Sequence, residues 1–282
     1  MKPNKAFLKQ PKTFWAYVRS ISQSVGYTVK GKGPLKGTIK IPDIAEMASA
    51  LASLGLNSSS LESKEGEPTE LGIRLHRYFA HRAAALNIEM PAQLMRASEA
   101  KLAYERLRER HDYSCPFPQN KQKGAMRAPA YLTCMVNMIV ELEIGDAECN
   151  FDPRALTTIT VNNAPVRTLA RRVDGAFPSV VNPTAIWEVK EYYYTTSFGS
   201  RIADGVYETM LDGMELEELQ SSEHIEVKHY LMIDGYETWW EDGKSYLCRI
   251  VDMLHMGYVD EVLVGREVPA LLPEIVRSWT RP

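Results

Sequence analysis

The chain has 282 residues, 45% of them hydrophobic and 24% charged, and a formal net charge of -3, as in an ordinary globular protein of one large or two modest domains. Its four cysteines lack CxxC spacing, which argues against a zinc site and a disulfide framework and indicates reduced cysteines. No signal peptide is evident, and the longest apolar run, near Leu132–Val140, is too short to span a bilayer. We therefore expect a cytoplasmic protein with no membrane segment.

The first 41 residues form a basic block, with nine Lys or Arg and no Asp or Glu. Apolar residues at helical spacing predict a helix at Thr13–Val25. The segment Gly26–Lys40 follows, and its glycines and lysines are typical of a flexible basic loop or a β-ribbon. We expect its lysines to contact the phosphates of a polyanion, although a solvated lysine-rich terminus is the alternative. These DNA-binding candidates are Lys30, Lys32, Lys36 and Lys40.

Helices are expected to dominate the next 70 residues. Pro42 and Asp43 begin a helix that Gly55 ends, and Asn57 could cap a second short helix. The layout resembles a helix-turn-helix, although a plain packed helical hairpin would give the same pattern. Two amphipathic helices are then expected.

The two amphipathic helices are Leu71–Leu86 and Pro91–His111. After them, Ser114–Arg127 is expected to be a boundary loop, because it holds two prolines, a glycine and several basic residues. We therefore divide the chain into a mainly helical region, residues 1–115, and a second domain, residues 116–282.

Helices and strands alternate in the second domain. The expected helices are Ala128–Glu143, Ser200–Leu219 and Lys244–Met256. The expected strands are Leu156–Val161, Arg167–Phe177, Thr184–Tyr193, Glu226–Ile233 and Val259–Val264. The first three strands would form an antiparallel meander, and the whole an α/β domain with a mixed sheet flanked by helices.

Three charged residues lie on two neighbouring strands that a proline-containing loop joins. Asp174 is on the first strand, and Glu188 and Lys190 are two apart on the second, so they point to the same face. A hairpin can bring Asp174 close to Glu188, and two adjacent carboxylates repel each other unless a cation lies between them. Hard oxygen ligands of this kind suit Mg2+, and a lysine beside them can orient or activate a water.

The pattern Asp-x13-Glu-Val-Lys on adjacent strands resembles the PD-(D/E)XK nuclease superfamily, the fold of most type II restriction endonucleases. The resemblance implies an Mg2+-dependent phosphodiesterase in which Asp174 and Glu188 hold the metal and Lys190 positions or deprotonates the attacking water. Val173 stands where the family often has a proline. The resemblance also implies a restriction-endonuclease-like core, whose αβββαβ order the predicted elements follow.

The same spacing occurs a second time in the chain, at Asp212, Glu226 and Lys228. Context decides between the two sets. The segment around Asp212 is typical of the end of a helix, so we expect this residue to lie away from the metal. The first set has the strand, turn and strand that the chemistry needs. The alternative is that Asp174, Glu188 and Lys190 are ordinary exposed strand charges.

The resemblance suggests further site residues. A helix that opens the nuclease core can carry a glutamate towards the metal, and Glu141 is our candidate, with Glu143 second; a solvent-facing acid is the alternative. Arg201 opens the helix after the motif strand and could touch a phosphate. Arg171 and Arg172 flank the site with the same possible role, although neighbours in a strand face opposite ways.

We therefore expect a type II restriction endonuclease that cuts double-stranded DNA at a specific sequence in host defence. Residues 1–115 would recognise DNA and form a homodimer whose two-fold axis matches a palindromic site. A cognate DNA methyltransferase would belong to the same system. The alternatives are a related nuclease of another phage-defence, transposition or repair system, a DNA-binding protein that does not cut, and a helical interaction protein with a decayed nuclease-like domain.

Overall fold

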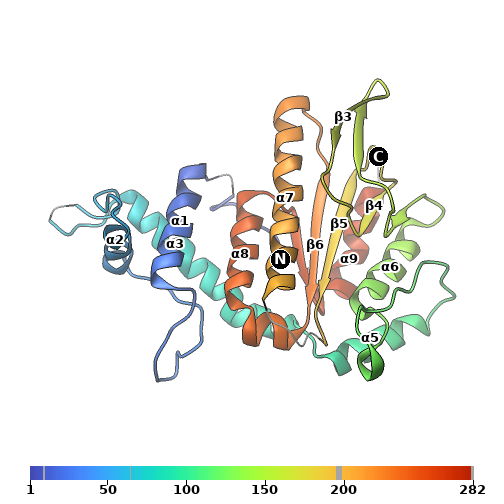
Figure 1. Ribbon diagram of the computed structural model, residues 1–282, viewed down its shortest axis with the longest axis horizontal. Coiled ribbons are helices and arrows are strands. Elements are labelled where there is room, and N and C mark those ends of the chain that lie inside the picture. Colours follow the sequence, from blue (N-terminus) through green and yellow to red (C-terminus); the bar gives the residue numbers. More distant parts are fainter. Residues whose placement is uncertain (9, 64, 195–198, 281–282) are drawn as a thin grey trace.

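The computed structural model describes residues 1–8, 10–63, 65–194 and 199–280, and it has a mixed α/β fold (Figure 1). Its α-helices are α1 Lys12–Val25, α2 Ile44–Ser53, α3 Glu70–Ala84, α4 Met90–Gln93, α5 Ala97–Arg108, α6 Tyr131–Ile144, α7 Ser200–Glu223, α8 Lys244–Met256 and α9 Glu267–Trp279. Its strands are β1 Asn150–Phe151, β2 Thr158–Val161, β3 Ala164–Thr168, β4 Gly175–Phe177, β5 Ala185–Glu191, β6 Lys228–Asp234 and β7 Glu261–Val264. The described elements also include the short π-helices η1 Ala85–Glu89 and η3 Glu237–Asp242 and the 3-10 helix η2 Gly124–Met126.

The centre of the molecule is a five-stranded mixed sheet with the order β1-β4-β5-β6-β7. Strands β1, β4 and β5 pair antiparallel, whereas β5, β6 and β7 are parallel. Gly175 of β4 pairs with Trp187 of β5, and a Cβ at Gly175 would lie 2.0 Å from the indole ring. The glycine therefore lets the tryptophan lie flat across β4, which fixes the register of the hairpin.

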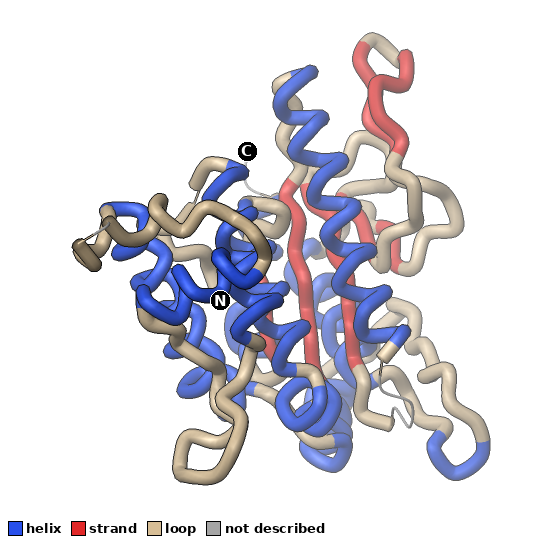
Figure 2. Tube along the Cα trace, turned by 60° about the vertical axis from the view of Figure 1, so that its left-hand side comes forward, coloured by secondary structure: helices blue, strands red, loops and turns tan. Residues whose placement is uncertain are grey.

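Helices cover both faces of the sheet (Figures 1 and 2). On one face, Trp187 and Met232 pack in one cluster with α6 and α9. On the other face, Leu231 and Ile233 pack with α7 and α8, and both clusters are apolar throughout. Because side chains alternate along a strand, the even-numbered residues of β5 face α7, and Glu188 and Lys190 are among them.

The N-terminal helices form their own apolar cluster around Tyr78 of α3 and join the sheet domain through α8. Asp252 of α8 accepts a 2.5 Å hydrogen bond from the Tyr78 hydroxyl and forms a 3.1 Å ion pair with Arg82. Nearby, His255 Nε2 lies 3.1 Å from His81 Nε2 and accepts a hydrogen bond from the backbone N–H of Asn4. This junction is therefore built from buried polar contacts.

Most of the predicted helices and strands are confirmed, and several differ. Among the described residues after α2 there is a turn and no second helix before α3, so the helix-turn-helix prediction is wrong. The helix expected at 91–111 is interrupted at residues 94–96. The single strand expected at 167–177 is two strands, because β3 pairs with β2 in a separate hairpin and β4 joins the main sheet. The predicted meander is wrong for that reason, and α9 was not foreseen.

The helix that follows the motif strand is longer than expected, since α7 extends to Glu223. Of the two alternatives for residues 26–40, a flexible loop or a ribbon, the structure shows the ribbon: the segment folds back on itself, with Thr28 bridged to Ile39. In the part of the chain that the structure describes, no helix is long and apolar enough to cross a membrane.

We predict that Asp252→Ala lowers the free energy of unfolding by about 3 kcal/mol, because it leaves the buried Arg82 guanidinium without its carboxylate. Denaturant-induced unfolding measures the change. The exposed pair Lys101–Glu105 supplies the control, and Glu105→Ala should cost less than about 1 kcal/mol. Equal effects of the two substitutions would contradict the importance of the buried pair.

Candidate active site

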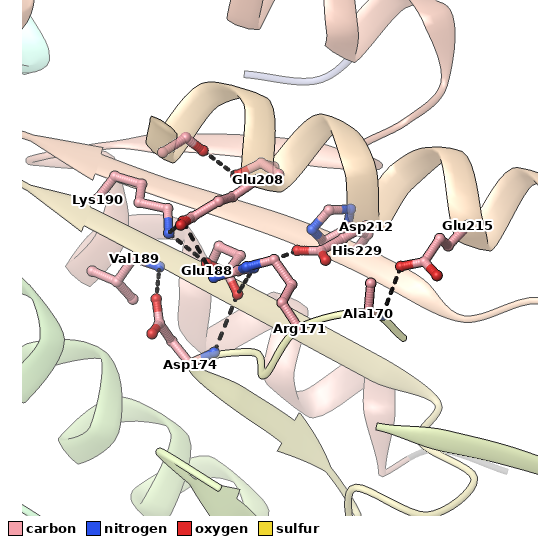
Figure 3. A network of polar contacts seen from close by, with 12 residues as sticks. Ala170, Arg171, Asp174, Glu188, Val189, Lys190, Glu208, Asp212, Glu215 and His229 are labelled. Carbon is pink, nitrogen blue, oxygen red and sulfur yellow. Dashed lines mark hydrogen bonds and ion pairs between the residues drawn. The ribbon is translucent and has the colours of Figure 1, made fainter. Parts of the chain in front are cut away.

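Glu188, in the middle of β5, is a fully buried carboxylate with a side-chain exposure of 0%. Two cations hold it (Figure 3). Arg171 lies 2.9 Å from Oε1, and Lys190 donates to Oε2 at 2.6 Å. A buried ionised group is stable only when paired in this way, so Glu188 requires both neighbours.

Helix α7 adds two more carboxylates to this group. Glu208 and Asp212 are four residues apart, so they share a face of the helix. Asp212 Oδ2 lies 2.6 Å from Arg171, and Glu208 accepts a 3.1 Å hydrogen bond from Lys190. Each cation is thus shared between the strand carboxylate and the helix.

Two glycines bring α7 close enough for these contacts. A Cβ at Gly205 would lie 3.2 Å from Cδ of Lys190 and 2.8 Å from the Tyr192 hydroxyl. A Cβ at Gly213 would lie 2.4 Å from the backbone oxygen of Tyr258. The absence of side chains at these positions therefore lets α7 settle directly on the strand and on the end of α8.

Asp174 lies just before β4 and faces the same cluster (Figure 3). Its Oδ2 accepts a 2.8 Å hydrogen bond from the backbone N–H of Val189, and its own N–H donates to Glu188 Oε1 at 3.3 Å. Burial and the negative charge of Glu188 raise the pKa of Asp174 to about 6. The strands thus bring the three motif residues together, with Asp174 and Glu188 close enough to repel each other.

The neighbouring charges set the ionisation of the other groups. Burial opposes the charge on Glu188, but Lys190 and Arg171 outweigh it and hold the pKa of this carboxyl below its ordinary value. Burial likewise opposes the charge on Lys190, but Glu188 and Asp174 raise its pKa above the ordinary value. Lys190 is therefore a fixed cation in this arrangement and not a free base.

The cluster has more negative than positive groups. Four carboxylates face two cations, and full ionisation would leave an excess of two negative charges. Burial and repulsion from Glu188 accordingly raise the pKa of Asp212 to about 7. The cluster therefore has the charge to accept either protons or a divalent cation.

Asp212 of α7 and His229 of β6 each have a buried atom that finds no hydrogen-bond partner among the described residues. These atoms are Asp212 Oδ1 and His229 Nε2. His229 Nδ1 lies 2.8 Å from the carbonyl oxygen of Tyr258, so Nδ1 carries the hydrogen and Nε2 is an acceptor. Two acceptors face this part of the cluster, and a proton on Asp212, which its raised pKa allows, reduces the cost of burying them.

Whether the cluster around Glu188 could hold a metal ion depends on the type of its donor atoms and on its charge. Within the described residues, no group of three or more His, Cys, Asp and Glu side chains is arranged to hold a metal. Mg2+ commonly binds through only one or two protein carboxylates, completing its shell with water and phosphate oxygens. Asp174 and Glu188 supply two hard oxygen donors, and the excess negative charge fits a divalent cation.

Sequence reasoning missed part of this cluster. The prediction that Asp212 lies at the end of a helix, away from the site, is wrong. Asp212 lies in the middle of α7 and is buried against Arg171. Glu208 and His229 were not foreseen. The available signal was the four-residue spacing of Glu208 and Asp212 on the helix after the motif strand. Arg171 does face the cluster, whereas Arg172 is exposed.

The remaining candidates lie elsewhere. Glu141 is on α6, which packs against the opposite face of the sheet from Glu188, and its carboxylate accepts hydrogen bonds from Ser114. The structure therefore does not bring Glu141 to the cluster. Glu143 pairs with Arg277 of α9. Arg201 is exposed at the start of α7, where its backbone oxygen accepts from the Tyr192 hydroxyl.

The proposed DNA-binding lysines lie on the ribbon between α1 and α2, which projects from the body beside α8 (Figure 1). Three of them, Lys30, Lys32 and Lys36, are exposed. Lys40 is partly buried and pairs with Glu46 at 2.7 Å.

The site thus belongs to a mixed α/β domain with a buried ionic cluster between a strand and the following helix. Residues 95–279 match a family model described as "Domain of unknown function (DUF7687)", which covers more than half of the chain, so the protein belongs to this family. Residues 1–88 match a second model, described as "Domain of unknown function (DUF7690)". No curated protein matches the chain. No solved structure matches it either.

The raised pKa of Asp212 predicts a pH-dependent contribution to stability. The folded protein holds this proton more tightly than the unfolded chain, so the stabilisation is present at low pH and is lost as the pH rises from 3.8 through about 7. Asp212→Asn cannot titrate. The unfolding free energy of the wild type minus that of Asp212→Asn should therefore fall by at least about 1 kcal/mol between pH 4 and pH 8. A difference that stays flat across this range contradicts the assignment.

Proposed function

We propose that the protein is an Mg2+-dependent endonuclease that hydrolyses phosphodiester bonds in double-stranded DNA. The observation that carries the proposal is the convergence of Asp174, Glu188 and Lys190 at one buried point. Asp174 lies just before β4, Glu188 and Lys190 lie on the neighbouring β5, and the carboxylates of Asp174 and Glu188 repel each other. This is the residue set that the PD-(D/E)XK resemblance requires.

The order of elements supports the same proposal. Helix α6 precedes β1, β4 and β5, and α7 then leads to β6, with the β2–β3 hairpin inserted after β1. Omitting that hairpin leaves helix, three strands, helix and strand. We propose on this basis that the domain is a restriction-endonuclease-like core of the αβββαβ type.

Each residue has a role in the proposed reaction. Asp174 and Glu188 would hold Mg2+, which would offset charge on the phosphate and make water a stronger nucleophile. Lys190, kept cationic by its carboxylate neighbours, would orient the attacking water and stabilise negative charge on the phosphate. Arg171, shared by Glu188 and Asp212, keeps the carboxylate of Glu188 in place.

The proposal extends to how the substrate is held. The ribbon lysines and Arg201 would contact phosphates of the duplex, and a homodimer would match the two-fold symmetry of a palindromic site. In a type II restriction system, a cognate DNA methyltransferase would protect the host DNA. If the protein is instead a nuclease of another phage-defence, transposition or repair system, the same residues would carry out the cleavage.

A second candidate is a DNA-binding protein that does not cut. The observation in its favour is that Arg171 and Lys190 already neutralise Glu188, so the cluster is stable as a structural ion-pair network. The two candidates differ in whether DNA is hydrolysed when Mg2+ is supplied.

The decisive experiment is plasmid cleavage with and without Mg2+. We expect cleavage with Mg2+ or Mn2+ and none in excess chelator, and binding without cutting in Ca2+. Lys190→Ala should lower the rate by about a hundredfold or more, because the group that orients the water is removed. Cleavage that persists in chelator would exclude the metal assignment, and wild-type protein that binds DNA but never cuts it would favour the second candidate.

Lys228→Ala is the matched control for Lys190→Ala. Lys228, the first residue of β6, stands in the second Glu-Val-Lys set, but its partners are Glu226, which lies before β6, and Asp260, which lies just before β7. The substitution should leave the cleavage rate within about twofold of the wild type, like other exposed changes. An inactive Lys228→Ala beside a fully active Lys190→Ala would reverse the catalytic assignment.

The role of the ribbon is tested by salt dependence. Replacing Lys30, Lys32 and Lys36 together by Ala should weaken duplex binding, and the slope of log affinity against log salt should fall by about 0.9 for each phosphate that the variant no longer binds. Fluorescence anisotropy at several salt concentrations measures both. An unchanged slope and affinity would show that the ribbon does not face DNA.

A further inference from the structure

A cluster of aromatic and basic side chains brings together α7, α8 and the ribbon. Arg249 of α8 is at its centre, with its guanidinium 5.8 Å from the ring centre of Tyr27, 5.7 Å from that of Tyr207 and 5.1 Å from that of Tyr246. It also donates a 2.6 Å hydrogen bond to the Tyr207 hydroxyl. The side chain of Tyr207, on α7, is 46% exposed.

The cluster continues to the start of α8 and onto the ribbon. Lys244 lies 4.4 Å over the ring of Trp240. A Cβ added at Gly37 of the ribbon would lie 3.8 Å from Nζ of Lys244, so the ribbon lies against the first turn of α8. We call the combined surface of the ribbon, Trp240, Lys244, Arg249 and Tyr207 the ribbon–α8 surface.

The ribbon–α8 surface has a high density of positive charge. Of its six cations, Lys40 pairs with Glu46. The other five form no ion pair with a carboxylate in the described part of the chain; these are Lys30, Lys32, Lys36, Lys244 and Arg249. Of the three acids of η3, Glu237 and Glu241 pair with Arg96, and Asp242 is exposed two residues before Lys244. A chain with a net charge of -3 thus concentrates cations here, which indicates a polyanionic partner.

The aromatic side chains of this surface indicate which kind of polyanion it binds. Proteins bind single-stranded nucleic acid with cations that follow the phosphates and with aromatic rings on which unpaired bases stack. In a duplex the faces of the bases are stacked on one another, so rings such as those of Tyr207 and Trp240 find no partner there. We propose that the ribbon–α8 surface binds a segment of single-stranded DNA.

This surface and the proposed catalytic site share α7. Tyr207 directly precedes Glu208, whose carboxylate binds Lys190. An unpaired strand on the ribbon–α8 surface therefore passes next to the helix that carries part of the ion-pair cluster. The choice of DNA over RNA rests on the proposed nuclease function, whereas the preference for a single strand rests on the surface alone.

The test is a binding measurement in excess chelator, where no metal-dependent cleavage interferes. A labelled oligothymidylate of about 20 nucleotides should bind the full chain more tightly than a duplex of equal length. Tyr207→Ala and Trp240→Ala should each weaken single-strand binding about fivefold or more, and weaken duplex binding less. Tyr207→Phe, which keeps the ring, should bind like the wild type, and Lys101→Ala on α5 controls for the loss of an exposed charge.

A second measurement needs no variant. A bromodeoxyuridine oligonucleotide, cross-linked by light to the wild-type protein, should attach to peptides that contain Tyr207 or Trp240. Cross-links confined to other peptides, tighter duplex binding, or tighter binding of oligouridylate RNA would each overturn the proposal. Strand binding by a protein that never cuts DNA would support this inference and count against the nuclease, so the two can fail separately.

Discussion

The buried carboxylate of Glu188 is the constraint on which the arrangement of the mixed α/β domain depends. A buried charge without contact to water needs an opposite charge beside it. Arg171, from a loop, and Lys190, from the same strand, form ion pairs with Glu188. These cations are in turn held by Glu208 and Asp212, which fixes where α7 crosses the sheet. The path of the loop, the strand and the helix is thus set by one charge and not by apolar packing alone.

A similar arrangement joins the N-terminal helices to the rest of the molecule. Arg82 and Asp252 meet where α3 crosses α8, with the Tyr78 hydroxyl on the same carboxylate. Apolar clusters fill each part of the protein, but these polar contacts define how the parts are placed. Buried hydrogen-bonded groups accept few alternative partners, so they favour one docking geometry over many.

The sequence alone predicted much of the fold and the centre of the site. Periodicity located α1, α3, α6, α7 and α8 because each has a continuous apolar stripe, and the alternation on β5 placed Glu188 and Lys190 on one face. The sequence-based prediction failed where contacts between distant parts of the chain determine the structure. The division of residues 167–177 between two sheets depends on long-range pairing, and the burial of Asp212 depends on a partner 41 residues away. Helical spacing alone does not show which face of α7 is buried.

The two glycines on the inner face of α7 limit how this protein could be stabilised. Replacing a helical glycine by alanine commonly favours the helix by about 1 kcal/mol, so Gly205 and Gly213 would look like obvious targets for thermostabilisation. At Gly213 even a methyl group would meet backbone atoms of Tyr258, which have no freedom to rotate away. At Gly205 the obstacles are the ends of two side chains, Tyr192 and Lys190, which their own polar contacts hold in place. The same substitution therefore has different consequences two turns apart: at Gly205 it would displace side chains of the ion-pair cluster, and at Gly213 it would push α7 away from the backbone of Tyr258.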